Sequence, residues 1–203
     1  MDNKELLNNR IWRTKGSRFN AYRRLAKKNS TLTFVTSCSS IHLLAISIIQ
    51  LTNLVTISTN QSQWLSFISI IISIIISIII LAYGLYENGK EHGLKSERHH
   101  SCGIELDGCY SKLQFIPNTE TDKISAIANE YNQITAKYLL NHETIDDIYF
   151  QLQNPDDFPN IAKISKFKRL RVELNYKHYD TIIGFIFVIV PVLISLVIMF
   201  YRA

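Results

Sequence analysis

Residues 64–86 read WLSFISIIISIIISIIILAYGLY, and this stretch decides the class of the protein. It contains no Asp, Glu, Lys or Arg, and single Ser residues interrupt its runs of Ile. A helix rises about 1.5 Å per residue, so about 20 apolar residues cross the roughly 30 Å hydrocarbon core of a bilayer. The stretch therefore predicts a membrane-spanning helix.

The charge-free region around this stretch extends from Lys28 to Glu87, which is too long for a single crossing. We predict a hairpin with spans over residues 31–51 and 64–86, joined by the polar segment TNLVTISTNQSQ at 52–63. A third charge-free run, TIIGFIFVIVPVLISLVIMFY at 181–201, predicts another span. A buried helix of a soluble domain is the alternative for each run, and it is strongest for the first run, which carries several hydroxyls.

Lys and Arg residues are concentrated on one side of the predicted spans. Nine of them precede the first span, against two acidic residues, and six more lie in residues 160–180. Because short basic segments beside a span stay in the cytoplasm, we expect the N-terminus to be cytoplasmic. The predicted organisation is a basic cytoplasmic arm at 1–30, a transmembrane hairpin at 31–86, a cytoplasmic helical region at 87–180, and a third span with a short external tail at 181–203.

The region between the second and third spans has helical periodicity. Thr119 with Asp122 resembles a capping pair at the start of a helix, and a second short helix over 145–152 should stop at Asn154 and Pro155. Few strand patterns compete, so we predict an all-α fold. The first of these helices is marked by apolar residues three or four positions apart, at Ile124, Ile127, Tyr131, Ile134 and Tyr138.

The last part of this region predicts a connection to the third span. Pro159 suits the first turn of a helix, and no strong helix breaker follows it before Gly184. We therefore predict one helix that continues into the membrane and couples the two parts mechanically. The cytoplasmic region is small for an independent domain, so homo-oligomerisation is expected.

Hydroxyl-bearing residues form an arc on each of the first two spans. Close packing of helices in lipid is one interpretation of these arcs, and a water-lined pore in an oligomer is the other. His42 is the one ionisable side chain in a predicted span, and Pro191 predicts a kink that is either fixed or a gating hinge. The arc of the second span holds Ser66, Ser69, Ser73, Ser77 and Gly84, and that of the first holds Thr33, Thr36, Ser37, Ser40 and Ser47.

The sequence contains no recognisable metal-binding or catalytic motif. The spacing of His99, His100, Cys102 and Cys109 matches no paired zinc motif, so no metal or cofactor is expected, and the thiols should be free. No phosphate-binding glycine loop, nucleophile elbow or HExxH motif occurs. Asp146 and Asp147 are adjacent and point about 100° apart on a helix, which does not suit paired carboxylate catalysis. We expect that the protein is not an enzyme.

The basic arm has an amphipathic pattern. Its apolar residues occupy one broad side and most of its charges the other, although Lys15 and Arg18 break this pattern. Anionic lipid headgroups are a better partner for such an arm than nucleic acid, and no direct nucleic-acid binding is expected. The apolar side holds Leu7, Ile11, Phe19, Tyr22 and Leu25.

Two segments carry a resemblance to a known family. They are RIWRTKGSRFNAYRRLAKKN at 10–29 and EYNQITAKYLLNHETIDD at 130–147. The chain resembles the SLATT family, SMODS and SLOG-associating two-transmembrane effector domains found beside nucleotide-signalling defence systems. The third apolar run departs from the two-span pattern and resembles the reverse-transcriptase-associated subfamily. The second segment carries the family's pattern of Tyr, then Asn-His, then Asp, here Tyr131, Asn141, His142 and Asp146.

The resemblance implies an antiphage defence effector of the prokaryotic inner membrane. Such an effector would oligomerise into a pore or otherwise breach the membrane, as in abortive infection, when a sensor, nucleotidyltransferase or reverse-transcriptase partner signals. A non-conducting membrane-anchored scaffold for such a partner is the alternative. Two roles are open for the pattern residues. One is contact with a partner, and the other is a structural role in which Asn141 and His142 end one helix while Thr144 and Asp146 begin the next.

Overall fold

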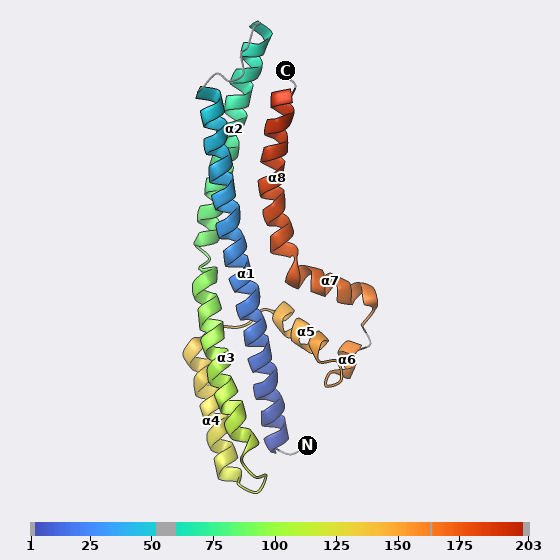
Figure 1. Cartoon of the computed structure of the whole chain (residues 1–203). Helices are drawn as coiled ribbons and strands as arrows, with labels where there is room; N and C mark the ends of the chain where they lie inside the picture. Colours follow the sequence, from blue (N-terminus) through green and yellow to red (C-terminus); the bar gives the residue numbers. More distant parts are fainter. Residues whose placement is uncertain (1–2, 52–59, 163, 201–203) are drawn as a thin grey trace. The chain divides into compact units, whose positions relative to one another are not determined.

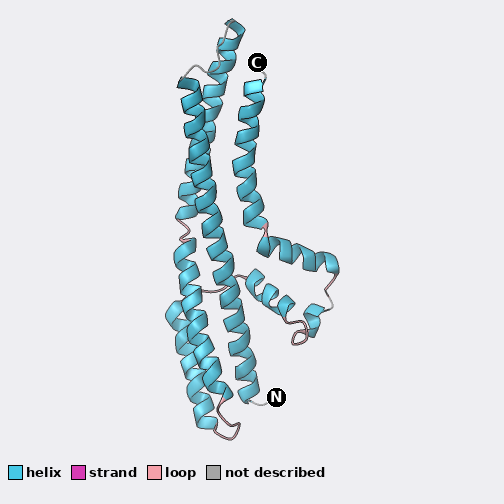
Figure 2. Cartoon of the chain, in the orientation of Figure 1, coloured by secondary structure: helices cyan, strands magenta, loops and turns pink. Residues whose placement is uncertain are grey.

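A computed structural model describes residues 3–51, 60–162 and 164–200. Side chains are described for these residues except 46–51, 60–70, 72–73, 160, 162, 180, 183, 187, 191 and 194–200. Within this part of the chain there are eight helices and no strand, which confirms the predicted all-α class (Figure 2). The helices are α1 (Asn3–Leu51), α2 (Asn60–Asn88), α3 (His92–Gln114), α4 (Thr121–Tyr138), α5 (Thr144–Gln153), α6 (Pro159–Ala162), α7 (Lys166–Lys177) and α8 (Tyr179–Phe200).

The chain divides into two compact units. Unit 1 comprises Met1–Lys27 and His92–Tyr179, and unit 2 comprises Lys28–Glu91 and Asp180–Ala203. Helix α1 contributes its first residues to unit 1 and the rest to unit 2 (Figure 1). The boundary expected near residue 30 between the basic arm and the first span is therefore not a break in secondary structure.

Unit 1 has a hydrophobic core between α1, α3 and α4. Apolar residues at helical spacing on each helix face the same interior, and Ile11, Leu106 and Leu113 are fully buried there. The periodicity expected for α4 is confirmed, since Ile124, Ile127, Tyr131 and Ile134 all belong to this core. Helices α5, α6 and α7 follow along the chain, with α5 packed against both others.

The ends of the helices in unit 1 differ in part from expectation. Helix α4 begins at Thr121 after Glu120, which makes no side-chain cap, so the Thr119 and Asp122 capping pair was wrong. Helix α5 begins after a capping box in which Asp146 accepts a hydrogen bond from the backbone N–H of Glu143 at 3.0 Å. Its end at Gln153, next to Asn154, agrees with the predicted stop.

Unit 2 consists of the rest of α1 with α2 and nearly all of α8. Its close contacts lie at glycines: a Cβ on Gly84 would be 3.3 Å from the Thr36 methyl, and one on Gly184 would be 2.8 Å from methyls of Thr31 and Val35. Small residues thus allow α2 and α8 to approach α1 closely. Lys28 and Glu87, the charged residues that bound the charge-free region, form an ion pair at 3.4 Å.

The apolar runs are helical in the described residues. Helix α2 starts at Asn60, four residues before the predicted span, and residues 52–59 of the predicted connection lie outside the described residues. Helix α8 covers most of the third run. Among the described residues, no helix combines the length and the apolar character that a membrane crossing requires.

The continuous helix predicted from Pro159 into the third run is wrong. Helix α6 ends at Ala162, and α7 begins anew after Ser165, whose hydroxyl accepts a hydrogen bond from the N–H of Lys168. Helix α7 ends at Lys177, where His178 closes the last turn before α8 starts. No proline or glycine occurs at these ends; the start of α7 is instead set by the Ser165 side-chain cap.

Candidate functional site

A buried ion pair joins α1 to the start of α5. The guanidinium of Arg24 donates to both carboxylate oxygens of Asp146, at 2.9 and 3.0 Å, and Asp146 is fully buried. Arg24 also pairs with Glu143 at 3.0 Å. The same Asp146 carboxylate caps α5, so one side chain fixes both the start of that helix and its position on α1.

A second ion pair lies eleven residues earlier on α1. Arg13 donates to the two carboxylate oxygens of Asp147 at 2.7 and 2.6 Å, and Ser17 and Gln151 also donate to this carboxylate. Burial alone would raise the pKa of Asp147, but these hydrogen bonds hold it below its usual value. The adjacent carboxylates thus face different arginines, as their angular separation on a helix requires.

Helix α7 is attached to the same part of α1. The Tyr176 hydroxyl donates to the backbone carbonyl of Asn20 at 2.8 Å, and its ring stacks on Tyr149 of α5 with 3.8 Å between centroids. The Asn20 side chain donates to the Asp146 carbonyl at 3.2 Å. Burial raises the pKa of Tyr176, so its hydroxyl remains a donor at neutral pH.

Arg18 is a buried cation with a neutral partner. Its side chain is 4% exposed, and one guanidinium nitrogen lies 3.2 Å from Nδ1 of His99, which is equally buried. Burial, followed by the charge of Arg18, lowers the pKa of His99 to about 4. Nε of Arg18 and Nδ1 of His142 have no hydrogen-bond partner within the described part of the chain. The arrangement keeps His99 neutral at physiological pH.

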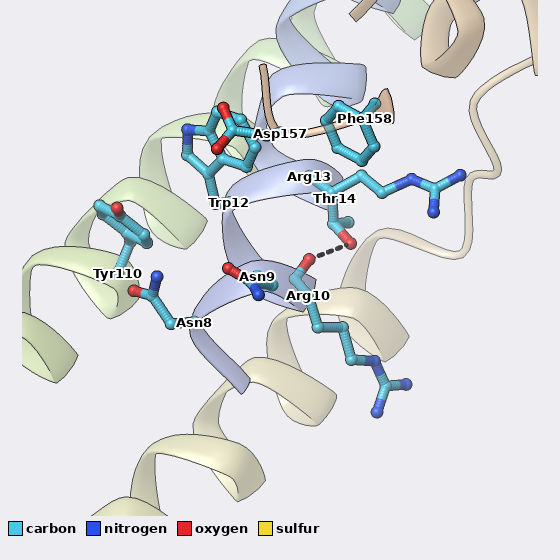
Figure 3. Close-up of a pocket in the computed structure, with 9 residues that line it drawn as sticks. All are labelled: Asn8, Asn9, Arg10, Trp12, Arg13, Thr14, Tyr110, Asp157 and Phe158. Carbon is cyan, nitrogen blue, oxygen red and sulfur yellow. Dashed lines mark hydrogen bonds between the residues drawn. The ribbon is translucent and has the colours of Figure 1, made fainter. Parts of the chain in front are cut away.

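A pocket opens on the surface of unit 1 next to this network. It has a volume of about 660 Å³, and α1 supplies most of its lining (Figure 3). The guanidinium groups of Arg10 and Arg13 extend from successive turns of α1, and the rings of Trp12 and Phe158 stack at 5.9 Å. Arg13 is already paired with Asp147, whereas Arg10 forms no ion pair within the described residues and can bind an anionic group of a partner. The lining residues are Asn8, Asn9, Arg10, Trp12, Arg13, Thr14, Tyr110, Asp157 and Phe158.

The structure brings three of the four pattern residues close to α1. The Tyr131 hydroxyl lies 3.1 Å from that of Thr14, Asp146 pairs with Arg24, and His142 is half-buried near Arg18. Asn141 is exposed in the segment between α4 and α5. Helix α4 already ends at Tyr138, with Leu139 in a left-handed conformation (φ 46°), so Asn141 and His142 do not end this helix.

The hydroxyl arcs are described in part. Thr33 and Ser40 are exposed, and each donates to a backbone carbonyl of its own helix; Thr36 does the same while it contacts Gly84. Ser77 and His42 are half-buried. The side chains of Ser47, Ser66, Ser69, Ser73 and Pro191 lie outside the described residues.

Sequence reasoning did not find the pairing of the arginines of α1. The signal was the break in the amphipathic pattern at Lys15 and Arg18: Arg18 is buried against His99, and Lys15 pairs with Asp107 at 2.7 Å. A charge on the apolar side of a helix indicates an internal partner. The identity of that partner could not be read from the sequence.

The cysteines of α3 belong to the hydrophobic core, and His99 and His100 contact residues of α1. Cys102 and Cys109 are fully buried in it, and burial raises the pKa of both thiols, that of Cys109 to about 11. The residues that the structure describes contain no group of three or more side chains that could hold a metal ion. His99 is engaged by Arg18, and His100 stacks on Tyr22 at 4.4 Å.

Comparison with protein families gives one match. Residues 1–197 match the model of SLATT_5, the SMODS and SLOG-associating 2TM effector domain family 5. This description names an effector domain with two transmembrane segments and no enzymatic reaction. No curated protein and no solved structure matches the chain.

Proposed function

We propose that this chain, which belongs to the SMODS and SLOG-associating 2TM effector domain family 5, is an inner-membrane effector of an antiphage defence system. On activation it assembles into an oligomer that breaches the membrane through the hairpin of α1 and α2. Unit 1 lies in the cytoplasm and receives the signal from a sensor, nucleotidyltransferase or reverse-transcriptase partner. The N-terminus is cytoplasmic, and α8 forms a third span.

The exposed apolar surface of unit 2 carries this proposal. Large aliphatic side chains on α2 point outward, with Ile78 61% and Leu81 63% exposed. Ile41 on α1 and Phe185 on α8 are exposed to a similar degree. Water would not favour such a surface, whereas lipid tails or other copies of the chain cover it at no hydrophobic cost. The Lys28 and Glu87 ion pair then marks the cytoplasmic end of the hairpin, where the two opposite charges compensate each other.

A hydroxyl stripe on α1 supports conduction. Thr33, Ser37 and Ser40 are all exposed and follow one another at helical spacing. In an oligomer these hydroxyls offer hydrogen bonds to water along a path between copies. Thr36, in contrast, turns its methyl towards Gly84 within one chain, and its hydroxyl donates to the backbone carbonyls of Leu32 and Thr33.

A pocket on unit 1 supports its proposed role as the part that receives the partner's signal. Its pocket presents Arg10, an exposed cation over the Tyr131 ring at 5.0 Å, beside Trp12 and Phe158. Arg13 lines this pocket and its ion pair with Asp147 connects the pocket to α5. An acidic partner segment in the pocket would therefore act on side chains that position α5.

The test is membrane depolarisation in cells that overproduce the chain without its partner. A potential-sensitive dye should report depolarisation for the unaltered chain, and Thr33→Leu with Ser40→Leu should reduce it. The matched control is Phe34→Leu with Ile41→Leu, which alters neighbouring exposed positions of α1 without removing hydroxyls. No depolarisation under any activating condition would exclude the pore.

The pocket also favours the second candidate function, a membrane-anchored scaffold that holds a partner without conducting ions. The variants Arg10→Glu and Trp12→Ala should then abolish recovery of the partner with the membrane fraction. Unchanged membrane potential together with partner recovery would support the scaffold over the pore. Loss of depolarisation on Thr33→Leu with Ser40→Leu would support the pore.

A further inference from the structure

Helix α7 packs against the other helices of unit 1 with one of its faces only. Tyr176 holds this face through its hydrogen bond to Asn20 and its stack on Tyr149. Lys27 adds a hydrogen bond from α1 to the carbonyl of Lys177. These contacts leave the other side of the helix uncovered.

The uncovered face is apolar. Phe167 is 78% exposed, Leu170 53% and Leu174 46%, and their spacing of three and four residues places them on one stripe. At 100° per residue this stripe is centred about 160° from Tyr176. A surface helix in water turns its apolar residues towards the core. In α7 they point away from the packed face, so they indicate a partner outside unit 1.

Basic residues flank the apolar stripe. Lys166, Lys168 and Arg171 are exposed and form no ion pair within the described residues, whereas Arg169 pairs with Glu173 at 3.4 Å. Glu173 is the one acidic residue among the twelve of α7. A second copy of this face would bring like charges together, which disfavours self-association. An anionic surface with an apolar interior satisfies both the cations and the stripe.

We propose that α7 lies in the headgroup layer of an anionic phospholipid bilayer, with Phe167, Leu170 and Leu174 inserted and Lys166, Lys168 and Arg171 at the phosphates. The proposal rests on the proposed membrane function, since only His178 separates the end of α7 from α8, which begins at Tyr179 and continues the chain into the third apolar run. Helix α7 then fixes unit 1 on the membrane surface beside this entry point.

The test measures the depth of single residues in the full-length chain. Phe167→Cys carries an environment-sensitive fluorophore in a Cys38→Ser background, where the remaining Cys102 and Cys109 are fully buried. The protein is placed in nanodiscs of phosphatidylcholine with equimolar phosphatidylglycerol, with or without nitroxide-labelled lipid. We expect blue-shifted emission and quenching by nitroxides near the headgroups. Replacing Lys166, Lys168 and Arg171 by Gln should weaken surface binding roughly fivefold per residue and reduce the quenching.

Two further sites make the result decisive. Phe115→Cys is a matched control, because Phe115 is a phenylalanine of unit 1 that is 88% exposed and lies outside the stripe on α7. Ile78→Cys reports membrane residence of unit 2. Quenching at 78 without quenching at 167 would overturn the proposal for α7 while the membrane function stands. Quenching at neither would overturn both, and a blue shift at 167 without quenching would assign the stripe to a second copy or another protein.

Discussion

The two units of this chain differ in how many of their large apolar side chains they leave exposed. Unit 1 buries large apolar side chains such as Ile11 and Leu106 and pairs its charges across helices. Among the described side chains, unit 2 buries Leu32, Val35 and Ile80 but leaves many large apolar side chains exposed, and its helices approach closely at Gly84 and Gly184. The first arrangement suits water outside and the second suits lipid. Composition averaged over the whole chain conceals this difference, since 47% hydrophobic residues is an ordinary value.

The two units are also stabilised by different interactions. Unit 1 relies on specific buried polar pairs, so the loss of one partner leaves an unpaired group inside. Unit 2 relies on close approach of helix backbones, so added volume is the damaging change there. Three substitutions test this contrast.

The largest effect is expected in unit 1, from Asp146→Ala. It removes both the partner of Arg24 and the cap of α5, and breaking a buried ion pair costs about 3–5 kcal/mol. Denaturant unfolding of the full chain in detergent, followed by Trp12 fluorescence in a Trp64→Phe background, measures the loss. Asp107→Asn is the control, because the Asp107 carboxylate is 56% exposed and its pair with Lys15 should contribute about 1 kcal/mol or less. Equal losses of unfolding free energy in Asp146→Ala and Asp107→Asn would contradict the idea that unit 1 depends on its buried polar pairs.

The second effect is a pH dependence confined to unit 1. Folding lowers the pKa of His99 from 6.5 to about 4, and that of His142 also falls. These histidines therefore bind protons more tightly in the unfolded chain than in the folded one. Their contribution to the stability of the folded state is fully present above pH 6.5 and decreases as the pH falls towards 4. The loss should reach at most about 3 kcal/mol for His99.

Unfolding measured by Trp12 fluorescence at several pH values tests this expectation. His99→Gln should flatten the profile between pH 6.5 and 4, whereas the contribution of the Arg13 and Asp147 pair is present above the ordinary Asp pKa of 3.8 and is lost only as the pH falls below it. A profile that His99→Gln leaves unchanged would exclude this histidine as its cause.

The smallest effect is expected from added volume in unit 2. In Gly184→Ala the new methyl would lie 2.8 Å from methyls of Thr31 and Val35, two β-branched side chains with little rotamer freedom. We expect a loss of about 1–3 kcal/mol in thermal unfolding in detergent. Gly108→Ala on α3 is the control: nothing lies within 4 Å of its Cβ, so helix propensity should stabilise it by up to about 1 kcal/mol. Changes of the same sign would refute close packing at Gly184.

Periodicity predicted the helices of this protein better than their ends. The faces of α4 and α5 follow apolar spacing, and both helices were placed correctly within a few residues. The breaks around α7 were missed: the Ser165 cap is a local hydrogen bond from Lys168 that apolar periodicity does not report, and the anchoring of Tyr176 is set by contact with the distant Asn20. For the candidate site, the pattern residues Tyr131 and Asp146 were identified, but their partners Thr14 and Arg24 were not.

The sequence by itself determined the helical class, the three apolar runs and the family, because each depends on local composition and spacing. The tertiary structure decided which charges meet. Arg24 and Asp146 are 122 residues apart, and the positions that α1 and α5 take in the folded unit bring them into contact. It also decided that α7 turns its apolar stripe outward, since the same periodicity would serve a buried face equally well.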